Sequence, residues 1–231
     1  MSGSSSIHFI FFVFLIFGLL NVRGHELPKA LPEDVSMSSE ELKKVDRVIQ
    51  KFIDDKDLAG AVTIIARKGK VIHFSAQGMQ DISAAKKMDK DSIFRIYSMT
   101  KAVVSVAAMR LVEQGKLKLD VPASTYIPSI AKMKLNGEIP NREMTLRDLL
   151  SHSSGLPNNV STDRALRAAG HPSLAESNLE EIMGRLESVP LRYEPGKGWY
   201  YSFAADVVGR LVEIGSGLQL DKALSDLIFD P

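Results

Sequence analysis

The chain of 231 residues contains no cysteine. This absence excludes a disulfide framework, a cysteine nucleophile and any cysteine-ligated zinc or iron–sulfur site. The chain also carries almost no net charge, because 29 Lys and Arg face 28 Asp and Glu. A neutral chain lacks the basic surface that binds phosphates, so nucleic acid is not expected as a partner. The five His show no metal-ligand spacing, and neither a metal nor another cofactor is expected.

Aromatic residues are scarce outside one N-terminal stretch, because Ile7–Leu20 is almost wholly apolar and holds five of the ten Phe. Val22 and Gly24 are small enough for the third and first positions before a signal-peptidase cut. We therefore expect residues 1–24 to be a signal peptide and the mature protein to be secreted, extracellular and without stable membrane association. No Lys or Arg precedes the stretch, so an uncleaved anchor and an error of gene prediction remain alternatives. The stretch is shorter than the about 20 residues of a membrane span.

Local patterns predict several helices and one β-hairpin. The expected elements are helices at 38–54, 98–114, 145–150 and 204–214, a helix capped by Ser177 and Glu180, and strands at 61–66 and 71–76. Helix 98–114 is apolar on nearly all sides and is expected to be buried. His73 is expected to be a packed side chain in the second strand, and Asp81–Asp91 a polar loop. A two-stranded hairpin is only marginally stable by itself, so the predicted strands are fewer than a sheet needs.

A Ser-x-x-Lys spacing occurs three times in the chain. The pairs are Ser83/Lys86, Ser98/Lys101 and Ser129/Lys132. On a helix this spacing places a hydroxyl and an amine one turn apart, where an unprotonated lysine can take the serine proton. The first pair lies in the polar loop and the last follows a proline, so both are expected to be solvated. Only the middle pair opens an apolar helix.

Two effects favour chemistry at Ser98/Lys101. The hydroxyl lies at a predicted helix N-terminus, where the helix dipole and free N–H groups favour negative charge. The apolar residues after Lys101 disfavour its ammonium form, so its amine can act as a base. From spacing alone, however, Ser98 as an N-cap and Lys101 as a surface residue fit at least as well.

Several stretches resemble, in order, the motifs of the serine β-lactamase-like hydrolases. They are FRIYSMTKA (94–102), LVEQGKLKLD (111–120), LRDLLSHSSGLP (146–157), EPG (194–196) followed by YS (201–202), and IFDP (228–231). This family includes class C β-lactamases, D-alanyl-D-alanine peptidases and β-lactamase-fold carboxylesterases. The resemblance covers about 58–231. It implies an α/β (α+β) fold of the β-lactamase/transpeptidase type, with an antiparallel sheet flanked by a helical region.

The resemblance also implies roles for three residues: Ser98 as the nucleophile, Lys101 as its activating amine and Tyr201 as a second base. A Lys101 ammonium beside Tyr201 would favour the phenolate, so the two groups could share a proton. Tyr200 is the neighbouring alternative, and a core aromatic is the alternative role for Tyr201. His152 is expected to be a structural corner and not a triad histidine, because no Gly-x-Ser-x-Gly motif is present.

The chain departs from the family pattern in two ways. Phe203 stands where class C β-lactamases carry an Asn that could orient a substrate carbonyl, which favours esters or small acyl amides over antibiotics. The family's third motif, on a strand that supplies an oxyanion-hole donor, lies beyond the IFDP stretch. The chain is therefore expected to be C-terminally truncated, with residues 25–231 as the N-terminal part of a hydrolase domain that lacks its C-terminal strands. Loss of one oxyanion donor costs about 10² to 10³ in rate, so little activity is expected.

The sequence hypothesis is a secreted serine hydrolase that forms an acyl-enzyme on small-molecule esters or amides, like the carboxylesterases of the family. One alternative is a D-amino-acid peptidase or β-lactamase. Another is a non-catalytic secreted binding protein that retains a relic of the site. The sequence does not indicate the oligomeric state.

Overall fold

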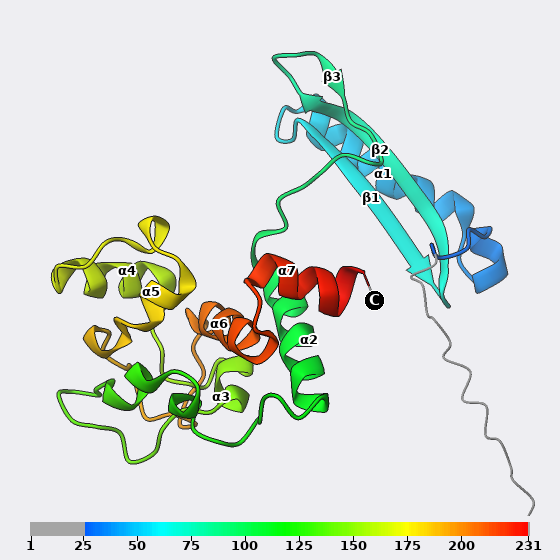
Figure 1. Ribbon diagram of the computed structural model, residues 1–231. Helices are drawn as coiled ribbons and strands as arrows, with labels where there is room; N and C mark the ends of the chain where they lie inside the picture. Colours follow the sequence, from blue (N-terminus) through cyan, green and yellow to red (C-terminus); the bar gives the residue numbers. More distant parts are fainter. Residues whose placement is uncertain (1–25, 231) are drawn as a thin grey trace, which may run out of the picture. The chain divides into compact units, whose positions relative to one another are not determined.

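The computed structural model describes residues 26–230, which form two compact units divided between Ser92 and Ile93 (Figure 1). The predicted signal peptide, residues 1–24, lies outside the described residues. Each unit has its own cluster of buried apolar side chains. Among residues 26–230, no helix has both the length and the apolar character to cross a membrane.

In the first unit, one helix packs on a small antiparallel sheet (Figure 1). Its elements are η1 (Pro32–Val35), α1 (Ser39–Asp54), β1 (Gly60–Arg67), β2 (Lys70–Asp81) and β3 (Lys86–Lys87), with the strands in the order β1-β2-β3. The predicted N-cap of α1 is confirmed, because the Ser38 hydroxyl accepts a hydrogen bond of 3.2 Å from the Glu41 N–H. The small core consists of Val35, Leu42 and Ile72.

The predicted hairpin is confirmed, and its turn explains its register. Lys68 and Gly69 both have positive φ values, 50° and 70°, as the tightest hairpin turns require. The second strand is longer than predicted because its end pairs with β3, where Met79 lies opposite Lys87. The predicted loop at Asp81–Asp91 therefore contains a short strand, which its charged sequence did not indicate. His73 is packed as expected, with its Nε2 2.9 Å from the Thr63 hydroxyl.

The second unit is helical and is organised around α6 (Ala204–Ser216), which contacts four other helices. The other helices are α2 (Thr100–Glu113), α3 (Leu146–Leu150), α4 (Asn159–Ala168), α5 (Leu179–Met183) and α7 (Leu220–Leu224). Short helical turns complete the unit: η2 (Tyr97–Met99), η3 (Ala123–Thr125), η4 (Pro128–Lys132), η5 (Leu174–Glu176), η6 (Leu186–Ser188) and η7 (Ser225–Phe229). Val207 and Leu211 of α6 are completely buried at the centre of this cluster.

The predicted end of α6 at Gly215 is wrong. The helix continues to Ser216, and Gly217 is the residue that ends it, with a left-handed φ of 75°. Gly215 has a different role, because a Cβ at this position would lie 3.1 Å from the side chains of Leu111 and Leu117. Its missing side chain therefore allows α6 to pack closely against the end of α2 and the segment that follows.

The prediction that helix 98–114 is buried is confirmed for only one side of the helix. Val104 and Leu111 of α2 are buried, but Val106 and Met109 are 53% and 38% exposed. An all-apolar sequence has no polar face to mark the side that points outward, so the pattern could not distinguish the two sides.

Two further elements differ from the sequence expectation. The cap of α5 is Asn178 and not Ser177, because the Asn178 side chain accepts from the Glu181 N–H at 2.9 Å and Glu181 accepts from the Asn178 N–H in return. Helix α4 was not predicted, since it is short and has few apolar residues.

Candidate active site

Ser98 lies in the turn η2, immediately before α2, and is exposed. Met99 is the N-cap residue of α2, and no side chain caps the helix, so the interpretation of Ser98 as an N-cap does not hold. The residue before the serine, Tyr97, has a positive φ of 44°, a strained conformation for a bulky aromatic residue. The exposed hydroxyl thus stands at the positive end of a helix on a strained turn.

Helix packing brings Lys101 and Tyr201 together. Lys101 lies in the first turn of α2, Tyr201 precedes α6, and these two helices pack against each other. The Lys101 Nζ lies 5.0 Å from the centroid of the Tyr201 ring. Hydrogen bonding with the Ser98 side chain, and then with that of Lys101, holds the pKa of Tyr201 below its usual value of 10.0. The three predicted catalytic residues therefore form one cluster.

Tyr201 and Tyr200 have different surroundings. Tyr201 is 45% exposed, which does not fit the alternative role of a core aromatic. The Tyr200 hydroxyl accepts a hydrogen bond of 3.0 Å from Asn158, and the Arg192 guanidinium lies 4.0 Å from its ring centroid. Of the two tyrosines, Tyr201 is therefore the one whose side chain contacts Ser98.

The other two Ser-x-x-Lys pairs make structural contacts. The Ser83 hydroxyl donates to Asp81 at 2.7 Å in the turn before β3. The Ser129 hydroxyl donates to the Met183 carbonyl, and Lys132 forms an exposed ion pair of 3.2 Å with Glu187. Both serine hydroxyls are therefore engaged in structural hydrogen bonds.

His152 forms the corner that the sequence predicts and also touches the site. Its φ is 56°, and its carbonyl accepts hydrogen bonds from the Tyr200 N–H (3.0 Å) and the Tyr193 hydroxyl (3.2 Å). Its Nδ1 accepts from the Ser202 N–H at 3.3 Å. Burial, and then the charge of Lys101, lower the pKa of His152, so the ring is neutral at pH 7. The ring lies 4.8 Å from that of Tyr201, a contact that the sequence did not reveal.

A buried carboxylate, that of Asp148, forms hydrogen bonds with the segments next to this corner. Arg142 binds Asp148 through two hydrogen bonds of 2.8 and 2.9 Å, and Thr145 completes a capping box with the same carboxylate. Burial raises the pKa of Asp148, but the hydrogen bonds from Arg142 and Thr145 outweigh it and leave the pKa below its usual value. Asp148 also accepts from the Ser153 hydroxyl at 3.3 Å, which ties the chain next to His152.

Phe203 is a core residue. Its side chain is 1% exposed and its N–H donates to the Pro157 carbonyl at 2.9 Å. A substrate therefore cannot meet this ring, and the position offers no amide for a substrate carbonyl.

A cavity of about 300 Å³ lies next to Lys101 and is also lined by Tyr97, Thr100, Asn159 and Asp206. Burial raises the pKa of Asp206, which no sequence pattern had singled out. This cavity has the size of the smallest ligand pockets.

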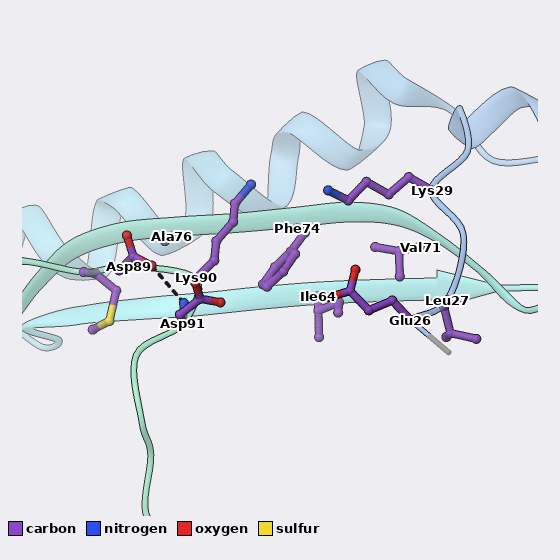
Figure 2. Close-up of a pocket in the computed structure, with 11 residues that line it drawn as sticks. Glu26, Leu27, Lys29, Ile64, Val71, Phe74, Ala76, Asp89, Lys90 and Asp91 are labelled. Atoms are coloured by element: carbon purple, nitrogen blue, oxygen red, sulfur yellow. Dashed lines mark hydrogen bonds between the residues drawn. The ribbon is translucent and has the colours of Figure 1, made fainter. Parts of the chain in front are cut away.

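A larger cavity, of about 680 Å³, lies in the first unit (Figure 2). Ile64 and Phe74, which are paired across β1 and β2, form its apolar floor, and Lys90 lies 5.1 Å above the Phe74 ring. Asp89, Lys90 and Asp91 border it, but no serine lines it. This groove therefore has no serine nucleophile of its own. Within residues 26–230 no cluster of His, Asp and Glu is arranged to hold a metal ion.

Residues 45–231 match the model of the family described as Beta-lactamase. Over 193 residues the chain is 36% identical to esterase EstB of Burkholderia gladioli, covering 81% of this chain and 49% of the relative. It is 29% identical to a lovastatin esterase of Penicillium rubens, covering 81% and 50%.

Among solved structures, one described as "EstCE1, a hydrolase with promiscuous acyltransferase activity" matches with a TM-score of 0.75 and 33% identity, covering 82% of this chain and 51% of that one. The chain spans about half the length of the curated relatives it matches. The α/β fold of the β-lactamase/transpeptidase type, with mixed helix and strand content and a small antiparallel sheet, is confirmed. The chain belongs to the serine β-lactamase-like hydrolase family.

Proposed function

We propose that the whole protein is a serine hydrolase that cleaves small esters through an acyl-enzyme, with Ser98 as the nucleophile. The observation that carries the proposal is the convergence of Ser98, Lys101 and Tyr201 in one exposed cluster, where hydrogen bonding lowers the pKa of the phenol. A phenol with a lowered pKa forms its phenolate more readily, and the phenolate can accept a proton from a neighbouring hydroxyl.

In the proposed reaction, the Ser98 oxygen attacks the ester carbonyl while its proton passes to the Lys101–Tyr201 pair. Collapse of the tetrahedral intermediate breaks the ester C–O bond, and the pair returns the proton to the departing alcohol. A water molecule then attacks the acyl-enzyme and loses its proton to the same pair. The bond between the acyl carbon and the Ser98 oxygen breaks, the pair returns the proton to that oxygen, and the acid leaves. Protons and bonds balance over the cycle, and no cofactor takes part.

Two features support esters as the substrate class. Phe203 is buried and apolar, so the position lacks the amide that class C β-lactamases present. The relatives named EstB and lovastatin esterase are esterases by name. A D-amino-acid peptidase or β-lactamase is the alternative. Comparison of p-nitrophenyl butyrate with nitrocefin as substrates of the whole protein distinguishes them, and preferential cleavage of nitrocefin would overturn the ester assignment.

The nucleophile is tested by covalent labelling with a fluorophosphonate probe, which reacts quickly only with an activated serine. Wild-type chain should label, Ser98→Ala should not, and Ser129→Ala, which removes a serine of the same spacing, should label like the wild type. Labelling that survives in Ser98→Ala would refute the assignment. A wild-type chain that does not label would favour the non-catalytic binding protein with a relic site.

For residues 25–231 by themselves, we propose binding of the probe but little turnover of p-nitrophenyl butyrate. Residues 25–231 do not include the family's third motif, which supplies an oxyanion-hole donor, and one such donor contributes about 10² to 10³ in rate. Robust esterase activity of these residues would contradict this expectation.

We further propose that the protein is secreted and that residues 1–24 are removed. N-terminal sequencing of the protein collected from the culture medium of a secreting host tests this. A mature N-terminus at His25 is expected, and retention of residues 1–24 on a membrane-bound product would indicate an anchor.

A further inference from the structure

Asp206 is a carboxyl group beside the proposed catalytic residues that the reaction above does not use. It lies in the first turn of α6, and its N–H donates to the Phe203 carbonyl at 3.0 Å. Its side chain is half-buried, yet among residues 26–230 no ion pair within 4.0 Å includes it. The nearest polar side-chain contact, from Asn159 Nδ2, is long at 3.5 Å. A half-buried carboxyl with so little compensation requires an explanation.

Asp206 and Lys101 line the same cavity of about 300 Å³. Much of the wall between them is apolar, formed by Val104, Leu179, Ala205 and Leu220. Apolar walls lower the local dielectric and strengthen the attraction between opposite charges. Two acidic groups are therefore near Lys101: the Tyr201 phenol, whose ring lies beneath its Nζ, and the Asp206 carboxyl, which lines the same cavity.

We propose that Asp206 is a positioning residue that acts on the reaction through Lys101. Its carboxylate attracts the Lys101 ammonium across the cavity and keeps the side chain beside Ser98. It also stabilises the positive charge that arises when the Lys101–Tyr201 pair accepts the Ser98 proton, as a carboxylate does for the protonated base of a serine triad. This inference rests on the proposed function.

The other groups around Lys101 are few. The titratable ones are Tyr97 from η2, His152 from the corner after α3, and Tyr201 and Asp206 from the start of α6. Helix α4 contributes the uncharged amide of Asn159 to the cavity, and α5 and α7 contribute only leucines. Asp206 is thus the acidic side chain that lines the cavity with Lys101.

The experiment uses two readouts on the 231-residue chain. The first follows the ¹³Cε signal of Lys101 with pH, assigned with Lys101→Met. Because Asp206→Asn removes a negative charge next to the ammonium, the midpoint of this signal should fall by about 1 pH unit. Asp206→Glu should restore it. Asp221→Asn is the matched control, since Asp221 occupies the first turn of α7 but is exposed, and it should leave the midpoint unchanged.

The second readout is the rate of fluorophosphonate labelling of Ser98 against pH. In Asp206→Asn the midpoint of this profile should move to lower pH and the plateau rate should fall about tenfold, while Asp206→Glu recovers most of the rate. A purely structural role would lower the rate without moving either midpoint. Unchanged midpoints in Asp206→Asn overturn the inference. If the wild type does not label but the Lys101 midpoint still moves, the proposed function fails while the coupling of Asp206 to Lys101 stands.

Discussion

The imidazole ring of His152 lies 4.8 Å from the phenol ring of Tyr201, with the two planes inclined by 39°. The same residue holds the backbone on both sides of that tyrosine, through its carbonyl to the Tyr200 N–H and its Nδ1 to the Ser202 N–H. The position of Tyr201 over Lys101 is therefore set by a corner that follows α3, some distance away in the sequence. His152 therefore both stabilises the backbone of the second unit and positions Tyr201 in the proposed catalytic cluster.

Stability should fall when His152 takes up a proton. Its pKa in the folded chain is below the usual 6.5, because burial and Lys101 disfavour the charged ring. The folded state thus gains stability from this residue above about pH 6.5 and loses it as the pH falls through the lowered value. Urea unfolding between pH 8 and pH 5 should show this loss. His152→Gln should have a flatter profile in this window, and an equal slope in both proteins would contradict the prediction.

Labelling of Ser98 should depend on ionisation of Tyr201. Because hydrogen bonding with Ser98 and Lys101 lowers the pKa of Tyr201, the phenolate forms below the usual pH of 10.0, and the labelling rate should rise with pH to a midpoint below that value. Tyr201→Phe should remove this rise and slow labelling about 10²-fold or more. Tyr200→Phe, which removes the adjacent hydroxyl, should retain the profile. Identical profiles for the two variants would exclude Tyr201 as the base.

Loss of Arg142 should destabilise the second unit by about 2 kcal/mol, because it leaves the Asp148 carboxylate buried without its guanidinium partner. Arg147→Leu is the matched control, since Arg147 makes a similar two-bonded pair with Asp120 on the surface. That change should cost about 0 to 1 kcal/mol. Urea unfolding of Arg142→Leu and Arg147→Leu measures both, and equal losses would contradict the role given to burial.

Gly215→Val should destabilise the contact between α2 and α6 by about 1 to 3 kcal/mol, because its Cβ would lie 3.1 Å from Leu111 and Leu117. Gly184→Ala is the control. A Cβ there meets only ordinary contacts of 3.6 Å, and the φ of −61° suits any residue. The control should be neutral or slightly stabilising. Thermal unfolding of both variants tests the packing, and a neutral Gly215→Val would show that the helices can move apart.

Phe203→Asn should not create a β-lactamase. The Phe203 side chain is 1% exposed, so the substitution places an amide in the core instead of in the site. We expect a loss of about 3 to 5 kcal/mol in unfolding free energy and no gain in nitrocefin hydrolysis. A stable variant that hydrolyses nitrocefin would show that this position does reach the substrate.

The sequence predicted the elements whose signals are local. Ser38 caps α1 through a residue three positions away, and Lys68–Gly69 makes a turn that only adjacent residues define. The prediction from the sequence failed where two neighbouring residues could each have the same role at the end of a helix. Ser177 and Asn178 are both residue types that cap helices, and Gly215 and Gly217 could each have ended α6. Which residue of each pair has this role depends on packing against the rest of the unit.

The sequence alone determined the family and the pair Ser98/Lys101. It also excluded a cysteine nucleophile, because the chain has no cysteine, and a basic phosphate-binding surface, because the chain has almost no net charge. A hydroxyl and an amine three residues apart are held together by one segment of backbone, so this spacing, together with the family motifs around it, is sufficient to find them. The family resemblance also indicated Tyr201, but only the tertiary structure showed that His152 and Asp206 join this group. These residues come from segments distant in the sequence, and they meet Lys101 because α2 packs against α6 and the corner at His152 closes over it. Contacts made by packing depend on the shapes of whole helices, which no local spacing records.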